Sequence, residues 1–220
     1  MVAQSLRRTT AYVGGTFTAL FWVGMSLSGE VPEEKAPAAE VISFYTDHAS
    51  RVRISAFVAV AAAVVILFFG GALRAAMRGD DDASGWGEML ATVLFGGAVA
   101  YALGLAGFAV TSFAVVEAAE LGQPEVAKAL NLLDSSNFFP AVVGISAMML
   151  AAGIRSRQAR LLPGWLAWAS IVVGALAPAG IAGFVAFMIF PLWVVVVGVT
   201  VARRTPERAA RRQAADTVAV

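Results

Sequence analysis

The side chains best suited to chemistry gather in one short segment, residues 45–51. This segment holds a phenol, a carboxylate, the only imidazole of the chain and a guanidinium, on Tyr45, Asp47, His48 and Arg51. On a helix Asp47, His48 and Arg51 share one face, because residues three and four apart are neighbours. Such a face can bind an anionic headgroup or respond to pH. We predict that it faces a ligand; the alternative is a local pair of Asp47 and Arg51, worth about 0.3–0.5 kcal/mol when exposed.

The other residue types exclude several chemistries. The chain contains no cysteine and one histidine, which excludes disulfides, iron–sulfur clusters, thiolate zinc sites and bis-histidine haem. A zinc site needs three or four ligands, and a single imidazole does not supply them at useful affinity. We therefore predict no metal, no other cofactor and no catalytic residue.

The composition predicts an integral membrane protein. Of the 220 residues, 59% are hydrophobic and 14% are charged, whereas soluble domains average about 45–50% and about 25%. Such a chain cannot cover a water-facing surface, which excludes a soluble enzyme, a nucleic-acid-binding domain and a disordered chain. We expect membrane lipids as partners and no nucleic acid; a partner membrane protein and further copies of the chain are the alternatives for a protein partner.

The apolar residues form six stretches of about the 20 residues that a helix needs to cross a hydrocarbon core. We therefore predict an all-α fold, a polytopic transmembrane helical bundle over residues 1–202, followed by a basic cytoplasmic tail over 203–220. Pro178, Ala179 and Gly180 supply the turn between the last two spans. The predicted spans are 11–29, 54–73, 89–116, 138–154, 161–177 and 181–202.

None of the six predicted membrane cores contains Asp, Glu, Lys, Arg or His. Ionisable side chains inside a bilayer are expensive and usually functional. Proton pumps, voltage sensors and intramembrane hydrolases need such groups for their chemistry. We therefore predict that the protein is not an enzyme.

The basic residues predict the orientation, because cytoplasmic loops carry an excess of Lys and Arg. With the N-terminus inside, the cytoplasmic segments hold 12 of the 16 basic residues and the outer segments hold 4. Six spans then place both termini in the cytoplasm. Lys35 and Lys128 are the only lysines, which together with abundant Ala, Val and Gly is typical of GC-rich bacteria. We predict a multi-pass protein of the bacterial plasma membrane.

Both long outer loops contain a proline followed by apolar residues at three- and four-residue steps. Pro37 precedes Val41 and Tyr45, and Pro124 precedes Leu130. Proline fits the first position of a helix, and this spacing is typical of an amphipathic helix. We predict two short amphipathic helices in the outer loops. Whether the two hairpins are an internal duplication stays open.

Small residues mark the third span as the central helix of the bundle. Gly96, Ala100 and Gly104 follow one another at four-residue steps, and such a stripe lets helix backbones approach closely. The side chains that we predict to line the centre of the bundle are polar: Tyr101, Thr111, Ser112 and Ser146.

Five segments carry a resemblance to known proteins: 40–48 with Arg51, 68–74, 129–134, 162–168 and 191–193. Through them the chain resembles a family of uncharacterised six-span membrane proteins of actinobacteria. The resemblance extends over nearly the whole chain. It implies the six-span fold and no established activity.

The sequence leaves two functions open. The first is a binding or accessory component of the membrane; an accessory subunit has a solid centre and an apolar, small-residue face for its partner. The second is a permease or flippase-like protein for a small apolar or amphipathic molecule. A permease has a cavity in the bundle, lined by the polar residues named above.

Overall fold

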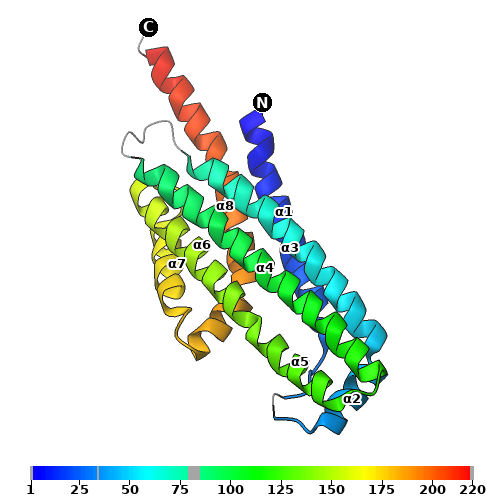
Figure 1. Ribbon diagram of the computed structural model, residues 1–220. Helices are drawn as coiled ribbons and strands as arrows, with labels where there is room; N and C mark the ends of the chain where they lie inside the picture. Colours follow the sequence, from blue (N-terminus) through cyan, green and yellow to red (C-terminus); the bar gives the residue numbers. More distant parts are fainter. Residues whose placement is uncertain (1, 34, 79–84, 219–220) are drawn as a thin grey trace.

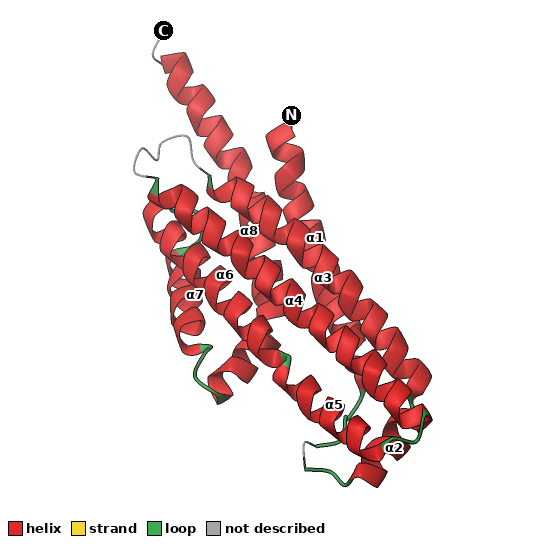
Figure 2. Ribbon diagram, viewed as in Figure 1, coloured by secondary structure: helices red, strands yellow, loops and turns green. Residues whose placement is uncertain are grey.

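The computed structural model describes residues 2–33, 35–78 and 85–218, with side chains for 9–33, 35–78, 85–134 and 136–203. The described residues form helices and no strand (Figure 2), which confirms the all-α prediction. The basic side chains of the predicted tail beyond Arg203 lie outside this description, although its backbone continues the last helix. The helices are α1 (Val2–Ser28), α2 (Ala38–Asp47), α3 (Ala49–Met77), α4 (Trp86–Glu120), α5 (Pro124–Ser136), α6 (Phe138–Ala159), α7 (Gly164–Leu176) and α8 (Ile181–Val218).

The helices form one elongated bundle with both chain termini at the same end (Figure 1). The long helices α3 and α4 run along its whole length, and α4 packs against α3 on one side and α6 on another. Helix α1 packs against α3 and α8, and α7 packs against α6. The short helices α2 and α5 lie at the end opposite the termini. We call that end the cap end, and the other the termini end.

Four described helical segments are long and apolar enough to cross a membrane: Ala49–Met77, Trp86–Glu120, Pro124–Ala159 and Ile181–Arg203. They support the prediction of a transmembrane protein, but four such segments are fewer than the six spans predicted. Helix α7 is apolar and has only 13 residues, about 20 Å of rise against a hydrocarbon core of about 30 Å. It is shorter than the predicted span 161–177 because Pro163 precedes its first turn and the chain turns after Ala177.

The described charged side chains lie towards the two ends of the bundle and leave an apolar belt between them. Helix α4 has 35 residues, about 52 Å, yet it carries no charged residue between Glu88 and Glu117. Helix α3 carries none between Arg53 and Arg74. Because both helices are longer than a hydrocarbon core of about 30 Å, they project from the apolar belt.

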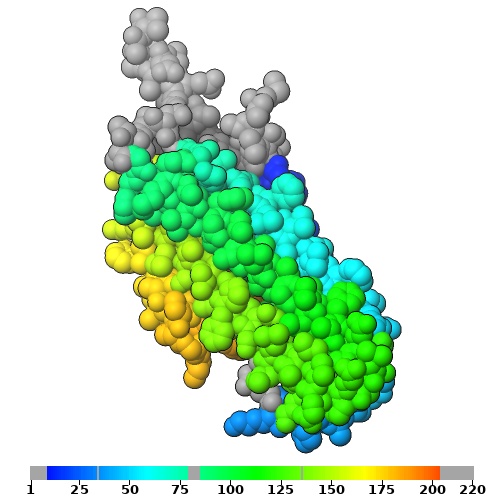
Figure 3. Space-filling model, viewed as in Figure 1, coloured from blue at the N-terminus to red at the C-terminus, as the bar shows by residue number. Residues whose placement is uncertain are grey.

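Large apolar side chains point outward along this belt. They include Phe57 and Phe68 on α3, Val110 on α4, Phe139 on α6 and Trp165 on α7, each about two-thirds exposed. Figure 3 shows the outer face along which α3, α4 and α6 lie side by side. Water-soluble monomers rarely expose apolar surface on this scale, whereas lipid chains cover it at no cost. The exposed surface therefore agrees with a membrane location.

An ion-pair network joins α3 to α4 at the termini end. Glu88 accepts hydrogen bonds from Arg78 Nε at 2.6 Å and from Arg74 at 3.0 Å. The guanidiniums of Arg78 and Arg74 lower the pKa of Glu88, which precedes the predicted span, to about 2. Nearby, the buried Arg155 donates Nε to the carbonyl of Met77 at 3.1 Å. This bond satisfies one of the carbonyls that the end of α3 leaves without an intrahelical donor.

Glycines of α4 and α6 allow close contact between these helices, and of the three residues in the predicted stripe Gly104 takes part whereas Gly96 does not. A Cβ on Gly104 would lie 2.8 Å from the backbone nitrogen of Ala141, and one on Gly97 would lie 2.8 Å from the carbonyl oxygen of Gly144. Gly96 is exposed, and a Cβ there would meet nothing within 4 Å. Ala100 is half-buried.

The helical repeat explains this difference. At about 100° per residue, each four-residue step rotates the stripe by about 40°, whereas seven residues return to within about 20°. Gly97 and Gly104 are seven apart and share a face; Gly96 is turned away from it.

A second, smaller core fixes α2 and α5 at the cap end. Val41 and Tyr45 of α2 are buried against Val115 and Val116 of α4 and against Ala127 of α5. The predicted amphipathic helix α2 is packed against protein, because its apolar side chains fill the space between the projecting ends of α3 and α4 and helix α5.

Candidate functional site

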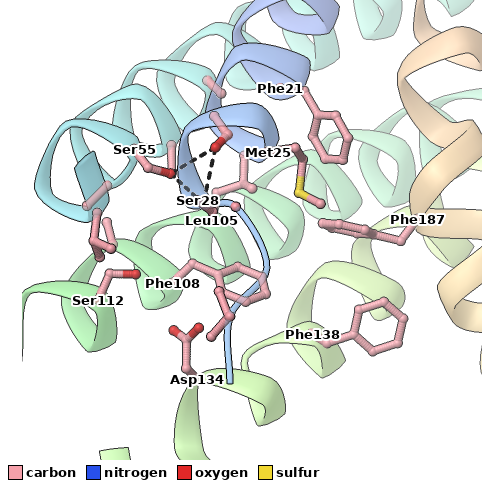
Figure 4. A pocket seen from close by; sticks show the side chains of 18 of the residues that line it. Phe21, Met25, Ser28, Ser55, Leu105, Phe108, Ser112, Asp134, Phe138 and Phe187 are labelled. Atoms are coloured by element: carbon pink, nitrogen blue, oxygen red, sulfur yellow. Dashed lines mark hydrogen bonds between the residues drawn. The ribbon is translucent and has the colours of Figure 1, made fainter. Parts of the chain in front are cut away.

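A cavity of about 450 Å³ lies between the cap end and the main core. Residues of α1, α3, α4 and α8 form most of its wall, and α2, α5 and α6 contribute one residue each. The lining residues labelled in Figure 4 are Phe21, Met25, Ser28, Ser55, Leu105, Phe108, Ser112, Asp134, Phe138 and Phe187.

Aromatic rings close the inner end of the cavity. Phe187 of α8 packs against Phe21 at 5.2 Å and against Phe138 at 5.5 Å between ring centroids. One helical turn from the lining residue Leu105, towards the termini end, Tyr101 is fully buried and packs against Phe190 at 4.8 Å. The centre of the bundle is therefore filled with rings, and the cavity lies on one side of it.

Hydroxyl groups line the wall between α1 and α3. The hydroxyls of Ser28 and Ser55 lie 2.7 Å apart, and Ser55 also donates to the carbonyl of Gly24 at 3.0 Å (Figure 4). Ser112 adds a third hydroxyl from α4. A helix contact built on Gly24 leaves room for these small side chains, which give the cavity a polar rim opposite its aromatic end.

Asp134 is the only charged side chain among the described residues that line the cavity. Its carboxylate points into the space beside Phe108 (Figure 4). Thr111 of α4 donates its hydroxyl to Asp134, and Asn137 donates Nδ2 to the Thr111 hydroxyl at 2.9 Å. No ion pair within the described part of the chain includes Asp134. These bonds fix the carboxylate in place without neutralising its charge.

Tyr45 joins the predicted cluster to the cavity. It is buried, lines the cavity and donates its hydroxyl to Asn131 Oδ1 at 2.8 Å. Asn131 in turn donates Nδ2 to the carbonyl of Pro32 at 3.2 Å, which ties α5 to the segment before α2. Burial, and secondly the negative charge of Asp134, raise the pKa of the Tyr45 hydroxyl. Tyr45 therefore stays protonated and acts as a hydrogen-bond donor.

The other members of the predicted cluster lie apart from Tyr45. Helix α2 ends at Asp47 and α3 begins at Ala49, so His48 stands at a corner and the expected common helical face is interrupted. Asp47 is exposed and accepts from Ser43 at 3.3 Å.

His48 and Arg51 are also engaged locally. The His48 ring stacks on Phe44 at 4.7 Å between centroids, and its Nδ1 lies 2.9 Å from the Phe44 carbonyl oxygen. Arg51 donates Nε to the carbonyl of Leu27 at 3.1 Å. No described ion pair joins Asp47 to Arg51.

The four polar residues predicted to line the bundle separate into different environments. Ser112 lines the cavity. Thr111 donates its hydroxyl to Asp134. Tyr101 is buried among aromatic rings, and Ser146 donates its hydroxyl to the carbonyl of Gly174, which joins α6 to α7.

Asp134 and Asn131 are the site residues that the sequence did not identify. From the sequence alone, Asp134 is interpreted as a helix cap before the fourth span. The available signal is spacing: Asn131 and Asp134 are three residues apart on an amphipathic helix and so share a face. What that face meets depends on α2 and α4, which are distant in sequence.

Within the described residues, no group of three or more His, Cys, Asp or Glu side chains could hold a metal ion. No protein-family model, curated protein or solved structure matches the chain. The resemblance to actinobacterial six-span proteins therefore stays a prediction, and the geometry of the cavity is the basis for a functional proposal.

Proposed function

We propose that this chain is a six-span protein of the bacterial plasma membrane, with both termini in the cytoplasm, that binds an amphipathic membrane molecule and catalyses no reaction. The cavity of about 450 Å³, with an aromatic end and a polar rim, is the observation that carries the proposal. Apolar clefts of about 300–1,000 Å³ with a few placed polar groups are the usual form of small-molecule sites.

Two further helices complete the proposed six spans. Helix α1 contributes Phe17 and Phe21 to the main core, and α7 packs along α6, so both lie at the depth of the apolar belt. The termini end carries Arg74, Arg78 and Arg155, which supports a cytoplasmic location under the positive-inside rule.

Cysteine labelling tests this topology, because the native chain contains no cysteine. Gln123→Cys introduces a thiol in the exposed connection between α4 and α5, and Gln158→Cys introduces one in the last turn of α6. A membrane-impermeant maleimide added to intact cells should label Gln123→Cys alone. Labelling of Gln158→Cys alone would reverse the orientation, and labelling of both would show that α6 does not cross the membrane.

Filling the cavity tests the proposed binding. Ala59 lines the cavity, whereas Ala61, two residues further along α3, is exposed on the outer surface. We expect the wild-type protein and Ala61→Phe, purified in mild detergent, to retain a bound amphiphile that mass spectrometry identifies after solvent extraction. Ala59→Phe should lose it, while all three proteins elute identically in size-exclusion chromatography. Equal retention by the two variants, or no bound amphiphile in the wild type, contradicts the proposal.

The one-sided cavity also favours a second candidate, a permease or flippase. Alternating access requires a conformation that is open towards one side and closed towards the other, and the rings of Phe17, Tyr101 and Phe190 fill the bundle next to the cavity. A transport function predicts flux of a labelled amphiphile between the leaflets of proteoliposomes. Binding without flux favours the first proposal.

A further inference from the structure

We propose that the bound molecule is a single-chain amphiphile whose head carries a protonated amine, and that Asp134 receives this head. The inference rests on the proposed binding function and names the chemistry of its ligand. It follows from the size of the cavity, from the separation of its polar and apolar walls, and from the charge of Asp134.

The size of the cavity favours one chain. A volume of about 450 Å³ lies in the lower half of the range of about 300–1,000 Å³ that small-molecule sites occupy. Phe21, Phe138 and Phe187 surround its inner end, where they offer aromatic surface to an apolar tail. A ligand with one apolar chain can enter this end with its polar head towards Ser55 and Asp134.

The carboxylate of Asp134 has capacity for a ligand. An ionised carboxylate offers about four lone-pair sites, and Thr111 is the donor that the structure places on it. A half-buried negative charge beside Phe108 is costly unless a counter-charge accompanies it. A protonated amine supplies both the positive charge and up to three hydrogen-bond donors.

The neighbouring basic side chains are engaged elsewhere or exposed. Arg51 donates to the carbonyl of Leu27, and Arg53 forms an ion pair with Glu120 at 2.7 Å. Lys128 lies on the exposed side of α5. The cavity therefore offers a negative charge without a protein counter-ion in the described ion pairs, and charge complementarity selects a cationic head over an anionic one.

Three probes with the same chain and different heads test this assignment: dodecylamine, dodecan-1-ol and dodecanoate. Titration calorimetry on the full chain in lipid nanodiscs measures their affinities. Hydrogen bonds between charged groups are stronger than those between neutral groups. We therefore expect dodecylamine to bind the wild-type protein about tenfold or more tightly than dodecan-1-ol does, and dodecanoate to bind most weakly. This comparison needs no variant.

Two substitutions test whether Asp134 causes the preference for the amine head. Asp134→Asn should remove the advantage of the amine and leave the affinity for dodecan-1-ol within about threefold, which also shows that the variant is folded. Asp47→Asn, the same change on an exposed carboxylate outside the cavity, should behave as wild type.

Each result separates the two proposals. Binding of the alcohol or the carboxylate as tightly as the amine, or an amine preference that survives in Asp134→Asn, overturns the assignment of the head and leaves the binding function intact. Failure of all three probes to bind, together with an Ala59→Phe variant that retains as much native lipid as wild type, overturns both.

Discussion

Two buried tyrosines differ in the hydrogen bonding of their hydroxyls, and removing these hydroxyls should have opposite effects on stability. Tyr101 is fully buried between Phe17 at 5.8 Å and Phe190 at 4.8 Å, and its hydroxyl has no hydrogen-bond partner among the described residues. Tyr45 is also buried, but its hydroxyl donates to Asn131 at 2.8 Å. Substitution by Phe keeps the ring in both cases and changes only the hydroxyl.

The magnitudes follow from the surroundings. A buried hydroxyl without a partner costs about 1–3 kcal/mol in proteins. Tyr101→Phe removes this cost and should stabilise the protein by about 1 kcal/mol. This is the lower end of the range, because the unfolded helix also stays in an apolar medium. Tyr45→Phe removes a hydrogen bond and leaves the buried amide oxygen of Asn131 without its donor, which should cost about 1–3 kcal/mol. The two variants should therefore differ by about 2–4 kcal/mol.

Thermal unfolding in nanodiscs, followed by circular dichroism, measures this difference. For a chain of this length 1 kcal/mol shifts the unfolding midpoint by about 2–4 °C. We expect Tyr101→Phe to unfold a few degrees above wild type and Tyr45→Phe several degrees below it.

A loss of about 1 kcal/mol or more in Tyr101→Phe would refute the reasoning. It would mean that the Tyr101 hydroxyl has a partner in the membrane, and that the rings beside the cavity are not a purely apolar filling. A neutral Tyr45→Phe would show that the bond to Asn131 does not hold α2 on α5.

Two further predictions concern helix packing and the termini end. Gly144→Ala should destabilise by about 1–3 kcal/mol, because its Cβ would lie 2.5 Å from the backbone nitrogen of Tyr101, whereas Gly96→Ala, with nothing within 4 Å, should stabilise by about 0.5–1 kcal/mol; chemical denaturation of both checks the opposite signs. Glu88, whose pKa its two arginines lower to about 2, should contribute stability above its unfolded pKa, near 4.5, and lose this contribution as the pH falls through about 2. Carboxyl carbon shifts in a Glu-labelled sample should show that titration, and Arg78→Gln should raise its midpoint; a wild-type midpoint near 4.5 would contradict the ion-pair network.

The helices could be predicted from the sequence because each depends on local patterns. Apolar runs bounded by charge locate α3, α4 and α6, and prolines before amphipathic segments locate α2 and α5, since Pro37 occupies the N-cap position of α2 and Pro124 begins α5. Their extension beyond the predicted spans is less visible. Contacts with α2 and α5 at the cap end stabilise the projecting turns of α3 and α4. No local sequence pattern indicates these contacts.

The candidate site depends on contacts between distant segments, which a single sequence does not specify. The stripe of Gly96, Ala100 and Gly104 follows a four-residue step, but packing selects the faces that meet α6, and these are Gly97 and Gly104. Likewise, the pattern around residues 45–51 favours one continuous helix, yet the chain turns at His48 so that α2 can reach α4 and α5. Of the predicted cluster, Tyr45 lines the cavity because of this turn.

The hydrogen bonds that join α5 to α2 and to the segment before α2 also set an order of events during synthesis of the chain. Asn131 bonds to Tyr45, 86 residues earlier, and to Pro32, 99 residues earlier. At about 5–20 residues per second, the ribosome needs about 4–17 s after making Tyr45 to reach Asn131. Until then α2 lacks the α5 side of its core, and Val41 has no cover from Ala127. The packing of α2 against α5 is therefore completed only after α1, α3 and α4 have been made. A nascent chain stalled within α4 leaves the side of α2 that faces α5 uncovered.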